Sequence, residues 1–226
     1  MSLVNGSTVI SSWVAGVGNG YVRWLKSPDF NAQDGSYAVA LGSYRTAAYS
    51  FMEQAVPTTV GQSYEVSAYF ATEGNGGPTV VSVLVNGSVI GSVANGLGLG
   101  SSGPAYTNLL WTQAALRFRA TASTSTIRFQ DATTGSDYAP IIDNISVILK
   151  PIPPVNLALR VSNGRATVNL TGQSGFRYRL ESATTLAAPI WSPVADVTFT
   201  SATNSVLDPA TSLGAIRFYR VTPLDP

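Results

Sequence analysis

The chain has 226 residues, of which 45% are hydrophobic and 11% charged, and its formal net charge is +1. Cys and His are both absent, which excludes zinc and blue-copper sites, cysteine nucleophiles and Ser-His-Asp triads. The nearly balanced charge gives no basic surface of the kind that nucleic-acid-binding proteins present. The sequence contains no run of about 18 apolar residues, so no membrane-spanning helix is predicted.

Apolar and polar residues alternate along most of the first 150 positions, which predicts β-strands rather than helices. The Asn86-Gly87 pair predicts a two-residue hairpin turn, because a type I′ turn needs positive φ at both central residues. The expected strands are Gly20–Lys26, Tyr37–Gly42, Tyr49–Val56, Ser63–Ala71, Thr79–Val85, Ser88–Val93, Thr112–Ala120, Thr126–Asp131 and Ile141–Leu149.

A proline-rich segment, LKPIPPV at Leu149–Val155, interrupts this pattern. Prolines lack the backbone donor and favour an extended chain, so the segment is expected to be a linker. A second alternation follows it in VNLALRV, RATVNL, FRYRLES and IRFYRV. We therefore predict an all-β protein with two domains, residues 1–150 and 151–226, joined by a linker at about residues 149–155.

Several motifs of the first half resemble the galactose-binding-like jelly-roll modules of secreted bacterial and plant proteins. They are DGSYAVALG (Asp34–Gly42), VPTTVGQSYEVSAYF (Val56–Phe70), the segment Trp111–Ala120 and YAPIIDNISV (Tyr138–Val147). The chain departs from that family at NGSTVISSW (Asn5–Trp13), which lacks the Glu that often helps to hold a structural calcium. The resemblance implies a β-sandwich jelly roll for residues 1–150.

The second half, with GFRYRLESATTLAAPIWSPVADV (Gly175–Val197) and IRFYRV (Ile216–Val221), resembles the fibronectin-type-III-like tails of secreted bacterial proteins. Together the two resemblances imply a secreted, extracellular accessory module that binds a poly- or oligosaccharide, or another cell-surface component, without catalysis. The alternative is a structural role, as a spacer or as a self-associating subunit of an extracellular array.

The strands Tyr49–Val56 and Ser63–Ala71 are expected to pair as a hairpin with aromatic rings on both faces. If Gln54 pairs with Val66, Phe51 lies directly opposite Tyr69 and the two rings form a flat platform suited to a sugar. The expected ligand-binding residues on this outer face are Tyr49, Phe51, Glu53, Glu65 and Tyr69. Two other interpretations stay open, namely that a loop or the second sheet covers this face, or that it contacts another protein.

Three carboxylates in the segment Gln130–Asn144, which are Asp131, Asp137 and Asp143, are weak candidates for calcium ligands. Calcium takes six to eight oxygen ligands, but the spacing does not match an EF-hand loop. The interpretation favoured for Asp143 and Asn144 is that they orient the last strand of the first domain. No resident cofactor is expected beyond this calcium candidate, and calcium is expected to have at most a modest effect on the fold.

Catalytic motifs are absent from the sequence: there is no phosphate-binding loop in a strand-to-helix context and no nucleophile elbow. On a hairpin, Glu53 and Glu65 could lie ~5–6 Å apart as a glycosidase pair does, but carboxylates are sparse in the chain and one such pair arises easily by chance. We therefore expect no enzyme activity. Trp24 is interpreted as a core or rim residue rather than a ligand-stacking ring, and Trp111 as structural. Phe176, Tyr178 and Leu180 are expected to face inward, whereas Arg177, Arg179 and Glu181 are assigned to a solvated face; a small basic stripe with Arg217 or Arg220 is the alternative.

Overall fold

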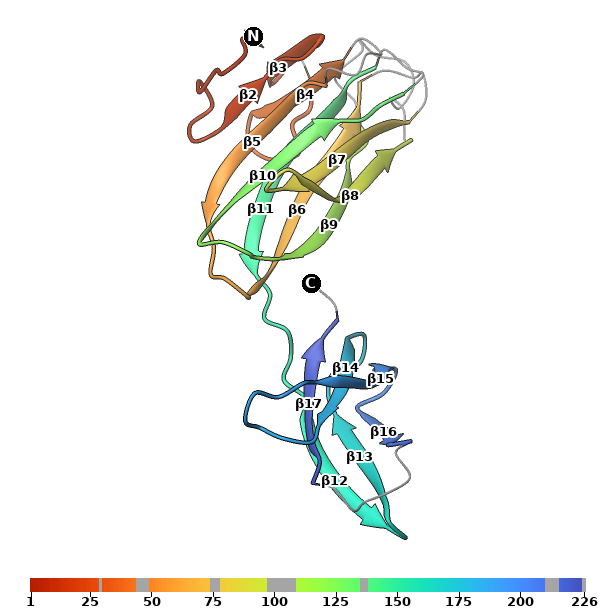
Figure 1. Cartoon of the computed structure of the whole chain (residues 1–226). Helices are drawn as coiled ribbons and strands as arrows, with labels where there is room; N and C mark the ends of the chain where they lie inside the picture. The colour runs from red at the N-terminus through yellow and green to blue at the C-terminus, as the bar shows by residue number, and fades with distance from the viewer. Residues whose placement is uncertain are drawn as a thin grey trace. The chain divides into compact units, whose positions relative to one another are not determined.

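The computed structural model describes residues 1–28, 30–43, 49–73, 78–96, 109–134, 138–209 and 216–224. All regular structure in these residues is β-strand, as predicted, and no helix among them is long and apolar enough to cross a membrane. The chain divides into two compact units, Met1–Lys150 and Pro151–Pro226, which are called unit 1 and unit 2 (Figure 1). Independent folding of the two units stays a prediction.

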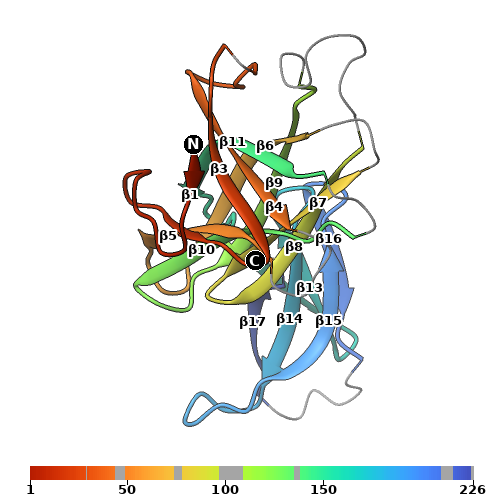
Figure 2. The same cartoon turned by 90° about the horizontal axis from the view of Figure 1, so that it is seen from above.

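Unit 1 is a sandwich of two antiparallel sheets, seen from a second direction in Figure 2. Sheet A has the strand order β1-β3-β4-β11-β6-β9, and sheet B has the order β2-β5-β10-β7-β8. The strands are β1 (Ser2–Leu3), β2 (Val14–Gly16), β3 (Gly20–Lys26), β4 (Tyr37–Ser43), β5 (Phe51–Pro57), β6 (Ser63–Thr72), β7 (Thr79–Val85), β8 (Ser88–Asn95), β9 (Thr112–Arg119), β10 (Thr124–Asp131) and β11 (Pro140–Leu149).

The predicted strands of this half are confirmed, β3 and β7 at both ends and the others to within two residues. The short strands β1 and β2 were not predicted, because two or three residues are too few to show a period. The turn between β7 and β8 has φ of 50° at Asn86 and 82° at Gly87, so the predicted turn with two positive φ values is confirmed.

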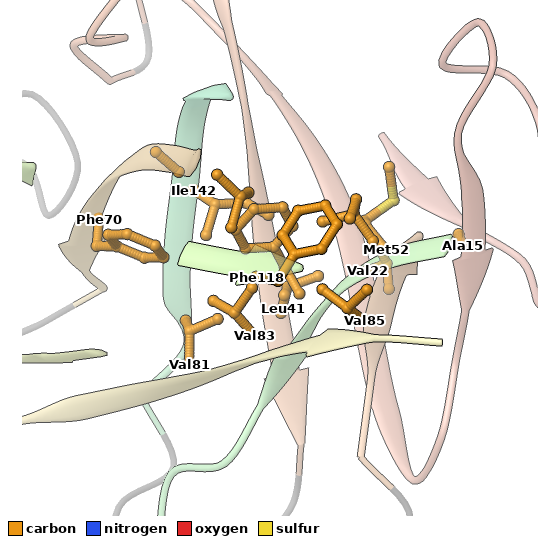
Figure 3. Close-up of a cluster of buried hydrophobic side chains, with 14 of the residues drawn as sticks. Ala15, Val22, Leu41, Met52, Phe70, Val81, Val83, Val85, Phe118 and Ile142 are labelled. Carbon is orange, nitrogen blue, oxygen red and sulfur yellow. The ribbon is translucent and has the colours of Figure 1, made fainter. Parts of the chain in front are cut away.

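The main core lies between the two sheets, where the inner face of each contributes alternate residues (Figure 3). Val22, Leu41 and Phe70 come from sheet A, and Val83 and Phe129 from sheet B; each is at most 3% exposed. Burial of such side chains contributes roughly 1.5–3 kcal/mol apiece. This core fixes which face of every strand points outward.

A second apolar cluster covers part of the outer face of sheet A. Phe30 and Leu109, from segments outside the strands, pack there against Ala40, Ala71 and Ile141. Trp111 packs against the same cluster and donates a hydrogen bond from Nε1 to the carbonyl of Asn31 at 3.2 Å, which confirms its structural role.

Unit 2 contains two three-stranded antiparallel sheets, β12-β13-β16 and β15-β14-β17. Their core includes Leu170, Tyr178, Leu180 and Phe199, and the Tyr178 hydroxyl donates a hydrogen bond to the carbonyl of Pro153 at 2.6 Å. The fibronectin-type-III likeness of this small sandwich stays a prediction. The strands are β12 (Asn156–Ser162), β13 (Arg165–Thr171), β14 (Arg177–Ala183), β15 (Ser192–Thr198), β16 (Thr203–Leu207) and β17 (Phe218–Pro223).

Candidate functional site

A cleft of about 490 Å³ opens between the two sheets of unit 1. Its walls come from β3, β4 and β11 of sheet A, from β5 and β10 of sheet B, and from the segment that precedes β2. Most of the lining is apolar, and the volume lies in the range of small-molecule sites. The groups that give it chemical character are Trp13, Trp24, Tyr37, Gln54, Asp143 and Asn144.

An irregularity in β11 shapes one wall of this cleft. The pairing of β11 with β6 shifts register between Asp143 and Ser146, and Asn144 has a φ of 47°. In a regular strand successive side chains point to opposite faces, yet the run Ile142–Ile145 lines the cleft without a gap. A β-bulge re-aims side chains in this way, and bulges are common beside binding sites.

Aromatic rings form the most distinctive surface of the cleft. The rings of Trp24 and Tyr37 lie 4.7 Å apart between centroids at an interplanar angle of 31°. Trp13 and Trp24 are half-buried against the main core, whereas Tyr37 is 41% exposed. The rings are thus held by packing on one side while part of their surface faces the cleft. Trp24 therefore lies at the rim of the core, which is one of the two positions predicted for it.

The Asp143 carboxylate is committed to the backbone. Its Oδ2 accepts hydrogen bonds from the N–H groups of Gln33 at 2.8 Å and Asp34 at 3.1 Å, and its Oδ1 accepts one from the N–H of Asn144 at 2.7 Å. Asn144 also donates from its side chain to Oε1 of Gln33 at 2.8 Å. Asp143 therefore ties the segment before β4 to the bulge, in agreement with the orienting role predicted for this pair.

Gln54 is a polar group that remains available in the cleft. It lies on the inner face of β5, between the apolar residues Met52 and Val56. Among the residues that the structure describes, the Gln54 amide has no hydrogen-bond partner. A half-buried amide in an apolar wall is a donor and acceptor that a ligand can satisfy.

The predicted hairpin platform is wrong in its pairing. β5 belongs to sheet B, where it pairs with β2 and β10, whereas β6 belongs to sheet A, where it pairs with β9 and β11. The predicted faces are nevertheless correct, because Met52, Val66 and Phe70 are buried in the core. Phe51 and Tyr69 consequently point outward from opposite sides of the sandwich and cannot form one surface.

Each outer face has its own contacts. The guanidinium of Arg128 lies over the Phe51 ring, 3.8 Å from its centroid, and forms an ion pair with Glu53 at 2.7 Å. The Phe51 ring also packs so close to Gly16 of β2 that a β-carbon there would overlap it. On sheet A, Glu65 lies 3.5 Å from both Arg117 and Lys150.

These contacts make the Phe51 surface part of the scaffold. Glu53 lies in sheet B and Glu65 in sheet A, so the two carboxylates do not form the catalytic pair considered for a hairpin. Tyr49 and Tyr69 are half-buried. None of Tyr49, Phe51, Glu53, Glu65 and Tyr69 is among the described residues that line the cleft, so ligand binding at them stays a prediction that competes with binding in the cleft.

The calcium candidates do not converge. Asp131 is buried at the end of β10 in sheet B, where it accepts a hydrogen bond from the N–H of Thr133 at 2.9 Å. Asp143 lies in sheet A, and Asp137 lies outside the described residues. The described ranges contain no group of three acidic side chains that could hold a metal ion. The expectation of no more than a modest calcium effect stays a prediction.

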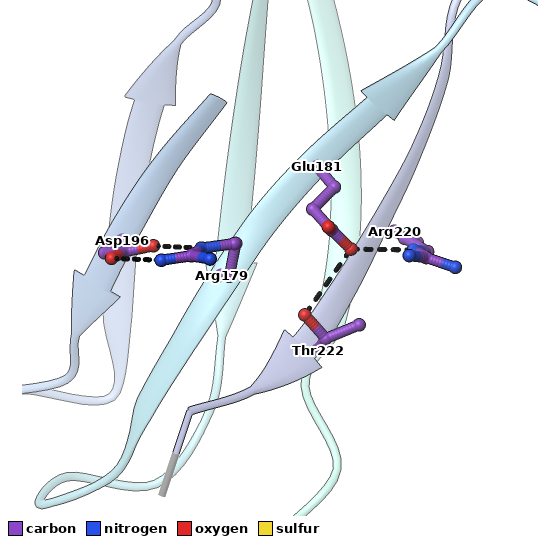
Figure 4. A network of polar contacts seen from close by, with 5 residues as sticks. All are labelled: Arg179, Glu181, Asp196, Arg220 and Thr222. Carbon is purple, nitrogen blue, oxygen red and sulfur yellow. Dashed lines mark hydrogen bonds and ion pairs between the residues drawn. The ribbon is translucent and has the colours of Figure 1, made fainter. Parts of the chain in front are cut away.

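The solvated face of unit 2 carries paired charges rather than a basic stripe (Figure 4). Arg179 forms two hydrogen bonds with the Asp196 carboxylate at 2.7 and 2.9 Å, and Arg220 pairs with Glu181 at 2.7 Å. The Arg179 guanidinium lowers the pKa of Asp196, chiefly through these hydrogen bonds. Arg217 is elsewhere, in contact with the buried Asp208.

Sequence reasoning missed Trp13, Tyr37 and Gln54 as site residues. Their segments are far apart in the chain and meet through the sheet topology alone. One signal was present: Gln54 is a polar residue at an inner position of β5, where the alternation calls for an apolar one.

Unit 1 is therefore an antiparallel β-sandwich module with an aromatic-lined cleft between its sheets. The chain belongs to the family described as "Protein of unknown function (DUF642)", whose model matches residues 1–148. No curated protein matches the chain.

Solved structures of similar fold include carbohydrate-binding modules and adhesin domains. The K1 cleaved adhesin domain of Lys-gingipain from Porphyromonas gingivalis W83 is 10% identical, with a TM-score of 0.48, over 66% of this chain and 98% of that one. A family 35 carbohydrate-binding module from Clostridium thermocellum is 18% identical, with a TM-score of 0.42, over 65% and 97%. TmCBM61, solved with beta-1,4-galactotriose, is 19% identical, with a TM-score of 0.43, over 66% and 97%.

Proposed function

We propose that the chain is a non-catalytic module that binds a carbohydrate in the cleft of unit 1. The observation that carries this proposal is the position of the Trp24 and Tyr37 rings in the same cleft as the unpaired Gln54 amide. The C–H face of a pyranose packs on aromatic rings, and a few placed polar groups fix its hydroxyls. Secretion from a bacterium and attachment to a cell surface are parts of the same proposal.

The charge of the cleft favours a neutral sugar. Asp143 is the one acidic residue among its described lining residues, and both of its oxygens already accept backbone hydrogen bonds. Glycoside hydrolysis commonly needs two carboxyl groups on either side of the scissile bond. The cleft offers stacking surfaces and the Gln54 amide, a combination that serves binding and not bond cleavage.

The test is a glycan-array screen of the intact chain, followed by calorimetric titration of Tyr37→Ala and Gln54→Met with the best neutral oligosaccharide. We expect Tyr37→Ala to weaken binding by roughly 1–2 kcal/mol through loss of ring contact. Gln54→Met keeps the volume and removes the amide, so it should cost about 0.5–1.5 kcal/mol. Melting temperatures of both variants should stay close to that of the wild type.

Phe51→Ala and Tyr69→Ala are the matched controls, because both rings lie outside the cleft. We expect them to leave sugar affinity unchanged. If these two variants lost sugar affinity and the cleft variants kept it, the sugar would bind on an outer face of the sandwich and not in the cleft. A glycan array without any bound sugar would refute the carbohydrate proposal itself.

A second candidate function, assembly with other copies of the chain, is favoured by a separate observation on unit 2, which is the exposed apolar row of β12.

A further inference from the structure

Strand β12 of unit 2 exposes an apolar row that its own unit leaves uncovered. Every residue of Asn156–Ser162 is exposed, including Leu157 at 39%, Leu159 at 55% and Val161 at 58%. Because side chains two residues apart share a face, these three form a continuous row. Contiguous exposed apolar rows are typical of interaction surfaces.

The register with β13 shows which face carries the row. Leu157, Leu159 and Val161 pair with Leu170, Val168 and Ala166, and these partners are at most 3% exposed. Residues directly opposite each other in a sheet point to the same side. The row is therefore the continuation of the core-facing side of this sheet to its outermost strand.

The other edge of β12 is also open. In the order β12-β13-β16 it is the terminal strand, so among the described strands it has one neighbour, β13. An edge strand presents unpaired backbone N–H and C=O groups that can pair with another chain. β12 lacks the usual protection against this, because NLALRVS contains no Pro and no acidic residue, and Arg160 is its one charge.

We propose that β12 pairs with β12 of a second copy of the chain, antiparallel and centred on Leu159. In this register Leu159 faces Leu159, and Leu157 faces Val161 of the other copy. Arg160 faces Ala158, so no like charges lie opposite each other. The strand is thus complementary to itself, and the two sheets join into one continuous sheet.

Neighbouring registers fit less well. Centring the pair on Arg160 places two guanidinium groups opposite each other, which is destabilising. A centre between two residues puts the apolar rows of the copies on opposite faces. In the Leu159-centred register, each of the three apolar residues lies opposite an apolar residue in β12 of the other copy. A single strand pair is a small interface, so the dimer is weak and forms at high local concentration, where it would make sugar binding multivalent.

Because the chain has no Cys, single cysteines introduced into β12 test this register directly. Directly opposite Cβ atoms lie about 4.5–5.5 Å apart, close to the separation that a disulfide requires. Leu159→Cys in the full chain should therefore cross-link to itself under mild oxidation. Leu157→Cys and Val161→Cys should cross-link poorly alone but efficiently when mixed. Equal cross-linking at all three positions, or none, would overturn the proposal.

Sedimentation of the full chain tests the reversible dimer. We expect the wild type to associate as its concentration rises, and Leu159→Lys to weaken association at least tenfold by setting two ammonium groups opposite each other. Ala158→Glu should strengthen association because it faces Arg160 of the other copy, whereas Ala158→Lys should weaken it. All these sites are exposed, so melting temperatures should not change. A monomer at every concentration, or a dimer whose association these substitutions leave unchanged, would refute pairing through β12.

Discussion

Unit 1 and unit 2 are both two-sheet sandwiches, but they cover their strands to different extents. Unit 1 has a core between sheets A and B and a second apolar cluster on the outer face of sheet A. Unit 2 has one core cluster between two three-stranded sheets, and its β12 stays exposed along its whole length. A smaller domain buries a smaller fraction of its surface, so it has less apolar area with which to cover its edges.

The polar contacts of the two units differ as well. In unit 1, the buried Asn95 of β8 donates hydrogen bonds to the carbonyls of Phe70 in β6 at 2.6 Å and Leu110 at 3.1 Å, which ties the sheets together. Unit 2 has a buried contact of this kind, in which Arg217 and Tyr219 donate hydrogen bonds to Asp208, but its pairs Arg179–Asp196 and Arg220–Glu181 lie on the solvated face. Buried hydrogen bonds are costly to break, whereas surface ion pairs contribute little.

The largest expected effect comes from removing one buried ring from each core. Phe129 packs against Trp13 and Phe70, and Phe199 against Tyr178; both phenylalanines are 1% exposed. Truncation to Ala should lower the unfolding free energy of its own unit by about 3–5 kcal/mol. A stability of roughly 0.05–0.15 kcal/mol per residue would give unit 2 about half the unfolding free energy of unit 1, because unit 2 is about half as long. Phe199→Ala should therefore come close to unfolding unit 2, while Phe129→Ala leaves unit 1 folded.

Differential scanning calorimetry of the intact chain measures both effects. We expect two transitions, one shifted by each substitution, together with limited proteolysis that cleaves near Pro151–Pro154. One transition that moves equally in both variants would contradict independent folding and with it the comparison of the two units.

The sequence predicts strand positions well because the signal is local. Alternation over seven residues is enough to locate β3 and β7 and to assign the inner face of β5 and β6. Strand partners are not local. The turn after Pro57 leads from sheet B to sheet A, and a link of this length is equally compatible with a hairpin. The face of Phe51 is therefore predictable, whereas its neighbours, Gly16 and Arg128, are not.

The cleft is less predictable still. Trp13, Tyr37 and Gln54 come from three segments, and they share a cavity because β5 of one sheet lies across from β3 and β4 of the other. The bulge at Asp143 and Asn144 depends on a shift in pairing between β11 and β6 that has no mark in the sequence pattern. In unit 2, the predicted inner positions of Tyr178 and Leu180 are confirmed, but β15 and β16 were not predicted.

An intermediate effect is expected at the anchor of the cleft. Asp143→Ala removes the acceptor for the N–H groups of Gln33 and Asp34 and should lower the unfolding free energy of unit 1 by about 1–3 kcal/mol. Amide hydrogen exchange of residues 31–36 should accelerate, because these residues lose their attachment to the bulge. Denaturant unfolding monitored by tryptophan fluorescence gives the stability. A variant as stable as the wild type would show that the Asp143 contacts are no stronger than the surface ion pairs of unit 2.

Chelation is the control for this variant. If Asp143 acts through backbone hydrogen bonds rather than through calcium, EDTA should leave the melting temperature of the wild type nearly unchanged. A loss of more than ~10 °C on chelation would instead reveal a strongly bound ion, since ligands that bind the folded state stabilise it by mass action.

The smallest effect is expected from the surface ion pair of unit 2. Hydrogen bonds from Arg179 lower the pKa of Asp196 below its ordinary value in the folded state. The stabilisation is therefore complete above the unfolded-state pKa of about 4, and it is lost as the pH falls through the lower folded-state value. Asp196→Asn should lower the melting temperature of unit 2 slightly at pH 7, by less than Asp143→Ala affects unit 1, and the difference should shrink progressively as the pH falls below about 4. Arg179→Lys, which keeps the charge but not the paired hydrogen bonds, should retain part of the effect.

Salt at 1 M, where the Debye length is about 3 Å, should shrink the difference because the pair is exposed. A difference between wild type and Asp196→Asn that is independent of pH and salt would assign the loss to packing instead, and the polar contacts of the two units would then be alike.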